Sequence, residues 1–485
     1  MSEPIHFQSV RQMSDALHTK EVSASELADA HLTRINKIDH RIGAYLTVTS
    51  DVARDQALVA DATLARGDGG ALTGVPMQLK DNMATRGIPT TCASLMLDGF
   101  LPPYDATVTQ VLAGEGAVLL GKGNMDEYAM GSSNETSAYK PVHNPWELNR
   151  VPGGSSGGPA AAVAAGLAAY SLGSDTGGSI RQPASLCGIV GLKPTYGLVS
   201  RYGLVAFASS LDQIGPLTRN VEDSALVMNA IAGYDPHDST SIQADKIDYT
   251  AGLTHGVKGL RLGIVPEYLG DGIDPRIADA TREAVQQLEA LGAEVTEISL
   301  PHSRAALAVY YVLAPSECSA NLARYDGVKY GYSAQDITGL MPALEATRER
   351  GFGTEVKRRM IMGTYALSAG YYDAYYKKAQ QVRTLIRHEF DAAFAKVDVL
   401  VTPTAPTTAF KLGEIQDPVV MHANDVCTVP ANIAGIPGIS VPCGFVDGLP
   451  VGLQILGAHL NEATILRAAY AYEQTTEWHM QHPDL

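Results

Sequence analysis

Two glycine-rich turns that carry serine residues are the part of this sequence best suited to chemistry. The first is GGSSGG at residues 153–158, the second is DTGGS at residues 175–179, and a short apolar segment separates them. Glycine is depleted from helices and strands because ordering it costs more backbone entropy than ordering other residues. Two such clusters therefore indicate turns whose backbone must come close to a ligand or to another part of the chain. Converging N–H groups in such turns can hold an anion or the oxyanion of a reaction intermediate. We therefore expect a site at these turns.

A serine hydroxyl is a poor nucleophile until a neighbouring base takes its proton. Lys80 is a candidate for that base, because it follows a short apolar stretch at residues 74–79 that is typical of a buried strand. Burial can lower the pKa of a lysine by several units and so leave its amine neutral near pH 7. A salt bridge between Lys80 and Asp81 is the structural alternative, and the spacing by itself favours it.

Other serine chemistries fit the same turns less well. The first turn also matches G-x-S-x-G, which in α/β-hydrolases places the serine, here Ser155, on a strand-to-helix turn. That class needs a histidine and a carboxylate downstream, and no histidine lies in a context that singles it out. The Asp-Thr-Gly at residues 175–177 resembles half of an aspartic-protease site, but the second copy that such a dyad requires does not occur.

The composition is that of an ordinary globular protein and excludes several functions. The chain has 485 residues, 45% apolar content and a net charge of -16, so a direct grip on nucleic-acid phosphates is not expected. Its five cysteines form no C-x-x-C pair, which argues against a zinc site or a disulfide framework and favours a reducing cytoplasm. The N-terminal segment lacks the pattern of a secretory signal, and the longest near-apolar run, 159–172, falls short of the roughly 20 residues needed to span a membrane.

Helices and strands are expected to alternate, which predicts an α/β fold with parallel or mixed strands. In the first half, Ser23 and Glu26 have the spacing of a capping box, and Asp105 is expected to cap a helix. In the second half, Asp447-Gly448 predicts a hairpin. The expected helices cover residues 5–40, 50–66, 106–113, 302–325, 354–396 and 461–475, the expected strands cover 44–48, 74–79, 117–120, 398–402, 439–446 and 451–456, and a βαβ unit covers 260–300.

Taken together, Lys80, the GGSSGG turn and the segment DTGGSIR resemble the amidase signature family. The resemblance continues through three longer blocks and covers essentially the whole chain; these blocks are residues 188–233, 355–386 and 424–444. The sequence shows no repeat and no convincing domain linker, which predicts one large domain over residues 1–485 with a helical excursion at about 305–395. The resemblance implies that this α/β domain has a mixed central sheet covered by helices on both sides. It also implies a Ser–Ser–Lys catalytic triad that uses no histidine.

The family pattern assigns a role to each member of this triad. Ser179, at the end of the second turn, matches the nucleophile. Ser155, the first serine of GGSSGG, matches the bridging serine, which follows a cis peptide in this family. Lys80 matches the base, and the backbone N–H groups of the second turn are expected to form an oxyanion hole; they belong to Thr176, Gly177, Gly178 and Ser179.

The later blocks are most similar to one branch of the family, the glutaminase subunits of tRNA-dependent amidotransferases. In that branch the pocket must hold the α-ammonium and the α-carboxylate of glutamine. Asp425 matches the residue that binds the ammonium, and one of Arg358 and Arg359, with Arg359 favoured, is expected to grip the carboxylate. Tyr310 or Tyr311 is a candidate for closing the pocket, although aromatic residues at helical spacing are usually packing residues.

This branch implies a set of partners, the B and C subunits of a heterotrimer. The ammonia would pass to the B subunit, which uses ATP and magnesium to phosphorylate and then amidate the glutamate or aspartate carried by a mischarged tRNA. The small C subunit would wrap around the pair. No cofactor or metal is expected in this chain itself, and tRNA would be bound mainly through the partner. The alternative is a stand-alone amidase of the same family that acts on another amide.

Overall fold

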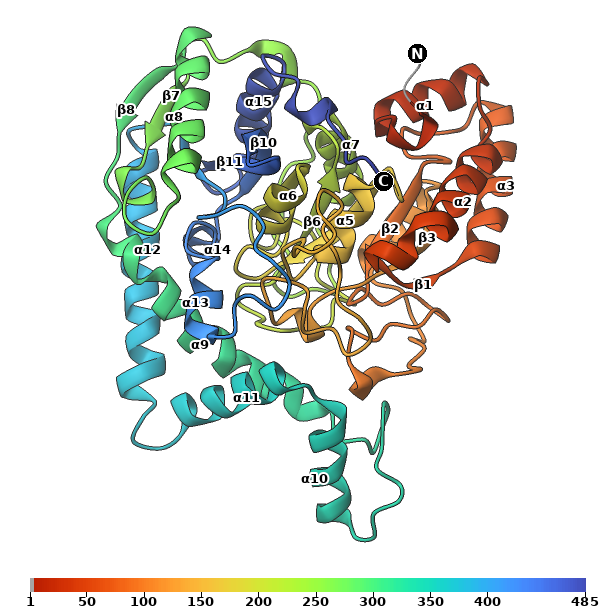
Figure 1. The fold of residues 1–485 in the computed structure, drawn as a ribbon, viewed down its shortest axis with the longest axis vertical. Helices are drawn as coiled ribbons and strands as arrows, with labels where there is room; N and C mark the ends of the chain where they lie inside the picture. Colours follow the sequence, from red (N-terminus) through yellow and green to blue (C-terminus); the bar gives the residue numbers. More distant parts are fainter. Residues whose placement is uncertain (1–3) are drawn as a thin grey trace.

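The structure, a computed structural model, describes residues 4–485 and is organised around a single mixed sheet (Figure 1). Residues 1–3 of the N-terminal segment, which we expected not to be a secretory signal, lie outside this range. The sheet has eleven strands among the described residues, in the spatial order β1 (Tyr45–Val48), β3 (Val118–Gly123), β2 (Pro76–Lys80), β4 (Tyr170–Asp175), β6 (Gln213–Thr218), β5 (Val190–Lys193), β10 (Gly438–Val446), β11 (Leu449–Gly457), β9 (Val399–Pro403), β7 (Arg261–Ile264) and β8 (Glu294–Glu297).

Strand directions in this sheet are mixed, as expected. β2 runs parallel to both β3 and β4, and β7 runs parallel to both β8 and β9. The remaining pairs are antiparallel, among them the hairpin of β10 and β11. β2 therefore lies between two parallel neighbours, where both of its faces are buried.

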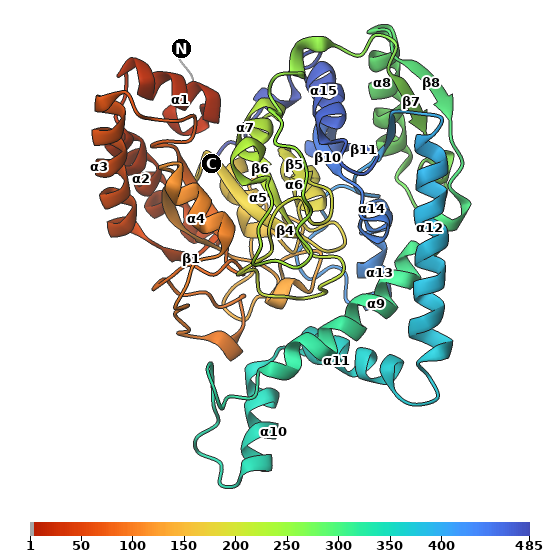
Figure 2. The same cartoon turned by 180° about the vertical axis from the view of Figure 1, so that it is seen from behind.

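Helices cover both faces of the sheet, which confirms the predicted fold class (Figures 1 and 2). In one group α5 packs on α6; in the other, α7 packs on α15 and α15 packs on α8. The helices are α1 (Val10–Thr19), α2 (Ala24–Ile42), α3 (Ser50–Arg66), α4 (Thr107–Gly114), α5 (Gly157–Ala164), α6 (Arg181–Cys187), α7 (Val221–Ile231), α8 (Pro275–Ala290), α9 (Ala306–Asn321), α10 (Leu340–Gly351), α11 (Thr354–Leu367), α12 (Lys378–Phe394), α13 (Pro418–Ala423), α14 (Val429–Ala434) and α15 (Glu462–Glu473).

Most local predictions are confirmed. Ser23 and Glu26 form both hydrogen bonds of a capping box at the start of α2. Asp447 and Gly448 have positive φ angles of 52° and 77°, as a two-residue hairpin turn requires. The cap predicted at Asp105 is wrong: α4 begins after Ala106, and the Asp105 carboxylate accepts a hydrogen bond from the backbone N–H of Arg86 instead, at 2.6 Å.

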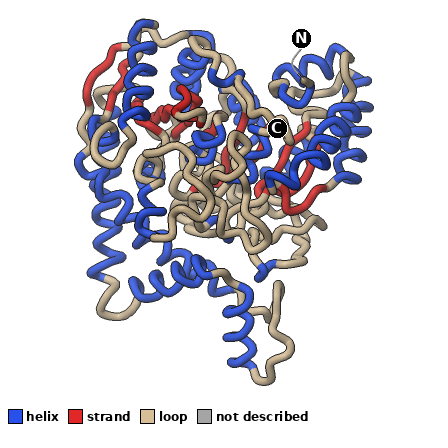
Figure 3. Tube along the Cα trace, in the orientation of Figure 1, coloured by secondary structure: helices blue, strands red, loops and turns tan. Residues whose placement is uncertain are grey.

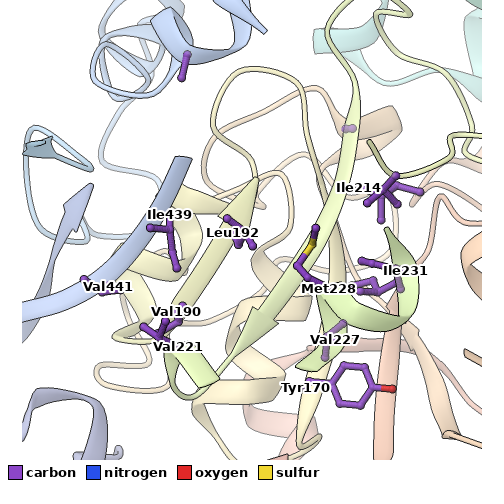
Figure 4. Packing of buried hydrophobic residues seen from close by; sticks show 14 of the residues in the cluster. Tyr170, Val190, Leu192, Ile214, Val221, Val227, Met228, Ile231, Ile439 and Val441 are labelled. Atoms are coloured by element: carbon purple, nitrogen blue, oxygen red, sulfur yellow. The ribbon is translucent and has the colours of Figure 1, made fainter. Parts of the chain in front are cut away.

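The segment that carries both glycine turns lies at the centre of the molecule. Every residue from 151 to 195 is buried, including all of α5, β4 and α6. Figure 4 shows apolar side chains from β4, β5, β6, α7 and β10 packed together around this centre. Burying each such side chain stabilises the fold by about 2 kcal/mol, so the turns are supported by a rigid core.

A helical arm and several long loops complete the chain. α9 packs against both α11 and α12, and α10 extends away from the body at the lower edge of Figure 1. Long loops, drawn in tan in Figure 3, gather between the helical sides of the molecule. α11 is the element that carries Arg358 and Arg359, so this arm positions the predicted substrate clamp.

Candidate active site

Lys80 is the last residue of β2, and its amine lies among three serine hydroxyls. Its Nζ atom is 2.8 Å from Ser155 Oγ, 2.8 Å from Ser156 Oγ and 2.9 Å from Ser174 Oγ. The side chain is fully buried, and within the described residues no carboxylate lies within ion-pair distance of it. The amine is therefore surrounded by groups that can exchange protons with it but do not neutralise its charge.

The alternative in which Lys80 forms a salt bridge with Asp81 is wrong. Asp81 Oδ1 lies 3.3 Å from Lys122 Nζ, and the Thr91 hydroxyl and N–H both donate to Asp81 Oδ2. Successive side chains along an extended backbone point to opposite faces, so neighbours in sequence are poorly placed to pair. The carboxylate beside Lys80 in the chain is thus neutralised by a lysine of β3.

Burial lowers the pKa of Lys80 to about 7, although the negative charges of Asp126, Asp175 and Asp212 act in the opposite direction. An ordinary lysine pKa is about 10.4, so this amine is neutral in a large fraction of molecules near pH 7. A neutral amine has a lone pair and can accept a proton. Lys80 thus has the property that a lysine base requires.

Ser155 follows a cis peptide bond, between Gly154 and Ser155. The Gly154 N–H donates to Gln182 Oε1 at 3.0 Å, and a Cβ atom at Gly154 would lie 2.1 Å from Asp126 Oδ2. Glycine is therefore required at this position. The α/β-hydrolase interpretation of the motif is wrong, because irregular backbone and not a strand precedes Ser155.

Ser179 lies in the turn that joins β4 to α6. It keeps 8% of its surface exposed, whereas Ser155 is completely buried. The carbonyl of Ser179 accepts a hydrogen bond from the Ser156 N–H at 3.2 Å, which links the two glycine turns. Among the described residues the Ser179 hydroxyl has no hydrogen-bond partner, so the structure joins Lys80 to Ser155 but shows no hydrogen bond from Ser155 to Ser179.

The backbone of the second turn leaves three of the four predicted N–H groups available. Those of Thr176, Gly177 and Ser179 donate to no other group in residues 4–485, whereas the N–H of Gly178 donates to Asp175 Oδ1 at 2.8 Å. Gly178 has a φ of +142°, and a Cβ atom there would lie 2.1 Å from Thr428 Oγ1. The turn is thus held in one conformation by contacts that only glycine permits.

A buried ion pair braces this turn. Arg181 contacts both carboxylate oxygens of Asp175, at 3.1 Å through Nε and at 3.0 Å through Nη2. Although burial opposes it, the Arg181 charge lowers the pKa of Asp175 to about 2. Beside it, the Thr176 hydroxyl donates to Asp212 Oδ1 at 2.7 Å. These contacts hold the turn and do not reach the three serines at Lys80.

A cavity of about 270 Å³ distinguishes the two predicted arginines. No residue of either glycine turn lines it, although Ser133, which does, lies close to the first turn: a Cβ atom at Gly154 would be 2.8 Å from the Ser133 nitrogen. Arg359 lines it and has a side chain only 3% exposed, whereas Arg358 does not line it and is 30% exposed. Both donate to Glu355 Oε1, Arg358 at 2.8 Å and Arg359 at 2.7 Å. The cavity is lined by Gly131, Ser132, Ser133, Glu135, Thr136, Glu355, Arg359, Ile415, Gln416, Pro418, Met421 and His422.

Asp425 does not line this cavity but contacts a residue that does. Its Oδ2 accepts a hydrogen bond of 2.6 Å from the hydroxyl of Ser132, a lining residue. Burial raises the pKa of Asp425 to about 7, against the effects of Ser132 and Arg359, which lower it. A buried carboxylate of this kind is stabilised in its charged form when a cation binds next to it.

Tyr310 lies directly against the second glycine turn. A Cβ atom at Gly177 would lie 2.8 Å from its Cζ atom. Tyr311 points elsewhere: its ring stacks on His422 with centroids 3.6 Å apart, and the Arg359 guanidinium lies over it at 5.4 Å. Of these two tyrosines, Tyr310 is thus the one in contact with the turn, and Tyr311 packs against the arginine.

A family model described as Amidase matches residues 26–466 of the chain. The chain belongs to the amidase family. The A subunit of a glutamyl-tRNA(Gln) amidotransferase from a Cyanothece species is 58% identical over 480 residues, covering 98% of this chain and all of that protein. The crystal structure of the Thermotoga maritima protein of the same name has a TM-score of 0.82 and 41% identity, covering 98% of this chain and 96% of that one.

Amidases with other names share this fold as well. The peptide amidase of Stenotrophomonas maltophilia has a TM-score of 0.84 at 32% identity, with 98% of each chain covered. Its TM-score is similar to that of the Thermotoga maritima protein, and its identity is lower. Within the amidase family, therefore, substrate must be argued from the pocket and not from the backbone.

Sequence reasoning missed three polar residues of this site. Ser156 and Ser174 contact Lys80 as closely as Ser155 does, and Ser132 holds Asp425. Ser156 is the second serine of GGSSGG, and Ser174 directly precedes the Asp-Thr-Gly-Gly-Ser turn, so proximity to the motifs could have indicated both. Ser132 lies outside every motif, and only the tertiary fold brings it to Asp425.

Metal-binding clusters and membrane-spanning helices are not found in the part of the chain that the structure describes. In residues 4–485, no group of three or more His, Cys, Asp or Glu side chains is arranged to hold a metal ion. No helix of that range combines the length and the apolar character that crossing a membrane would require. All five cysteines are buried and free.

Proposed function

We propose that this chain is the glutaminase subunit of a tRNA-dependent amidotransferase. It would hydrolyse glutamine to glutamate and supply the ammonia that converts Glu-tRNA(Gln) to Gln-tRNA(Gln), or Asp-tRNA(Asn) to Asn-tRNA(Asn). The observation that supports this chemistry is the buried amine of Lys80, which has no counterion among residues 4–485 and lies 2.8 Å from Ser155 Oγ. The relatives named as the A subunit of such an enzyme support the assignment to this branch.

In the proposed reaction, Ser179 Oγ attacks the side-chain carbonyl carbon of glutamine. As the bond forms, the Ser179 proton passes to Ser155, and the Ser155 proton passes to neutral Lys80. The negative charge that develops on the carbonyl oxygen is bound by the free N–H groups of Thr176, Gly177 and Ser179. Gly178 completes the predicted oxyanion hole only if its N–H group leaves Asp175.

The intermediate then collapses. The carbon–nitrogen bond breaks, the leaving nitrogen takes the proton back from Lys80 through Ser155, and ammonia departs from a γ-glutamyl ester on Ser179. Water attacks the ester carbonyl with the same residues as base, so glutamate leaves and the Ser179 hydroxyl is restored. Lys80 is the proton acceptor in both halves of the reaction and the proton donor to each leaving group.

The pocket supports an α-amino acid as the substrate. Arg359 lines the cavity, and Asp425 lies directly behind its lining residue Ser132, an arrangement that suits the α-carboxylate and the α-ammonium of glutamine. An amidase that acts on an uncharged amide gains nothing from this pair. Tyr310, against Gly177, would limit the space beside the reacting carbonyl.

The ammonia would be used by a partner. We propose that the B subunit of the complex holds the charged tRNA, ATP and magnesium, that a small C subunit joins the pair, and that the complex works in the cytoplasm. The net charge of -16 on this chain supports tRNA binding through the partner and not through this chain.

The test is glutamine-dependent amidation of Glu-tRNA(Gln) by the complex purified with its neighbouring subunits. The intact complex should release glutamate and form Gln-tRNA(Gln), whereas the complex with Ser179→Ala should do neither with glutamine but should still amidate with added ammonium chloride. Glutaminase activity that survives Ser179→Ala would refute the nucleophile. A chain that hydrolyses uncharged amides but not glutamine would be a stand-alone amidase.

A further inference from the structure

The amine of Lys80 has more neighbours than the proposed proton relay uses. Ser155 takes part in the relay, whereas Ser156 and Ser174 lie at 2.8 and 2.9 Å without a role in it. Ser156 is fully buried and Ser174 is 2% exposed, so neither hydroxyl is held there by solvent. A buried hydroxyl is costly unless its hydrogen bonds are satisfied, so this arrangement needs an explanation.

The partners of the two hydroxyls determine which way they face Lys80. The Ser156 hydroxyl donates its single hydrogen to the carbonyl oxygen of Ser174 at 3.1 Å. The Ser156 oxygen can therefore only accept a hydrogen bond from Lys80. Asn82 Nδ2 donates to Ser174 Oγ at 2.9 Å, so Ser174 accepts from a second nitrogen besides that of Lys80. Both oxygens therefore have lone pairs available to the amine.

Asn82 has no other side-chain hydrogen bond. Its Oδ1 atom is buried and, within the described residues, has no partner, while its Nδ2 contacts Ser174 alone. A buried amide oxygen without a partner destabilises the fold, and a purely structural residue at this position would not need to incur that cost. The hydrogen bond to Ser174 is thus the one polar contact that the Asn82 side chain makes in residues 4–485.

We propose that Ser156 and Ser174, with Asn82 behind Ser174, position the catalytic amine. A neutral amine has two hydrogens and one lone pair. When Ser156 and Ser174 accept the two hydrogens, the lone pair is directed at Ser155 Oγ, from which the proton must come. These three are positioning residues for the reaction proposed above, on which this inference rests.

The same arrangement suits the charged form of Lys80. After proton transfer the ammonium has three hydrogens, and the three serine oxygens accept one each. The carboxylates that act on Lys80 at longer range are Asp126, Asp175 and Asp212, and the thiol of Cys92 also acts on it. Because these groups are unchanged in a Ser174 variant, removal of one hydroxyl should disfavour the ammonium and lower the pKa of Lys80.

The experiment follows the rate at which a fluorophosphonate labels Ser179 as a function of pH. In this step Ser179 Oγ displaces fluoride and its proton passes to Lys80, so the rate reports the amine without depending on which amide is the substrate. Wild-type labelling should rise with pH through a midpoint near 7. Ser174→Ala should lower the plateau roughly tenfold and move the midpoint to lower pH. Asn82→Asp should move it to higher pH, because a nearby negative charge favours the ammonium.

Ser171→Ala is the matched control. Ser171 is a buried serine of the same strand, and its hydroxyl donates to the Gln78 carbonyl at 2.9 Å, away from Lys80. Its labelling midpoint should equal that of the wild type. Thermal unfolding of each variant establishes that it folds, and Asn82→Asp, which lies on a different segment, tests the idea even if Ser174→Ala does not fold.

The outcomes separate the two proposals. If the labelling midpoint of both Ser174→Ala and Asn82→Asp stays at the wild-type pH, the positioning role is refuted, and Ser174 and Asn82 only pack against the core. Opposite shifts in the two variants would support it. If the wild type is labelled at Ser179 but does not hydrolyse glutamine, the proposed substrate fails while the positioning of Lys80 stands; if Ser179→Ala is labelled as fast as the wild type, the nucleophile fails.

Discussion

Adjacent arginines on α11 allow a sharp test of the glutamine pocket. Arg359→Ala should raise the KM for glutamine strongly, and Arg358→Ala should leave it nearly unchanged. Arg359 lines the cavity, whereas Arg358 is directed toward Glu355 and His422, with its Nη2 atom 3.0 Å from His422 Nε2. Each variant leaves Glu355 with one guanidinium, so neither substitution leaves that carboxylate without a counterion.

The expected magnitudes follow from burial. Removing one member of a buried, hydrogen-bonded charge pair costs about 2–5 kcal/mol, which for Arg359→Ala corresponds to a rise in KM of about 30-fold or more. Arg358 forms a partly exposed ion pair with Glu355, and such pairs contribute about 0–1 kcal/mol. Arg358→Ala should therefore change KM by less than about fivefold.

The assay compares glutamine with 4-aminobutanamide, which is glutamine without its α-carboxylate. If Arg359 binds that carboxylate, Arg359→Ala should lose activity on glutamine but should hydrolyse 4-aminobutanamide as well as the wild-type enzyme does. A larger loss in Arg358→Ala than in Arg359→Ala would refute the assignment. So would an equal loss of Arg359→Ala on both substrates, because the arginine would then support the fold and not the substrate.

Three further predictions concern the base, the ammonium site and the turn. Burial lowers the pKa of Lys80 to about 7, and the base must be neutral to accept a proton, so kcat/KM should fall about tenfold per pH unit below 7. The Lys80→Arg variant should be inactive at every pH, and measurable turnover by it would argue against a lysine base. Asp425→Asn should raise the KM for glutamine about 30-fold with little change in kcat, whereas an unchanged KM would remove the ammonium site. Gly177→Ala should lower kcat at least about tenfold, because its Cβ atom would lie 2.8 Å from Tyr310 Cζ, and normal turnover would show that the turn tolerates displacement.

Local sequence signals predicted much of the fold because they depend on short-range physics. The capping box at Ser23 and the hairpin at Asp447-Gly448 each depend on a few adjacent residues, and both are present. The cap at Asp105 was wrong because a cap signal does not say which N–H competes for the carboxylate, and here Arg86 does. The order of strands in the sheet could not be obtained in this way, since it depends on contacts between distant segments.

The candidate site was predictable only in part, for a similar reason. The motifs indicated Lys80, Ser155 and Ser179, because glycine-rich turns and an unusual lysine are visible in sequence. The contact between Ser132 and Asp425 joins positions 293 residues apart, and nothing local indicates it. The choice between Arg358 and Arg359 depended on which face of α11 is turned to the cavity, and helical periodicity alone does not say which neighbours lie there.

The position of Lys122 explains how Lys80 can serve as a base at all. In the register of β2 and β3, Lys122 is opposite Leu79, one residue before Lys80, and its amine lies 3.3 Å from Asp81. A carboxylate paired with Lys80 would stabilise its ammonium and raise its pKa, and the amine would then be protonated at pH 7. Because Lys122 neutralises Asp81, the neighbours of Lys80 are hydroxyls, and burial determines its pKa. Because Lys122 pairs with Asp81, Lys80 has no carboxylate next to it that would keep its amine protonated.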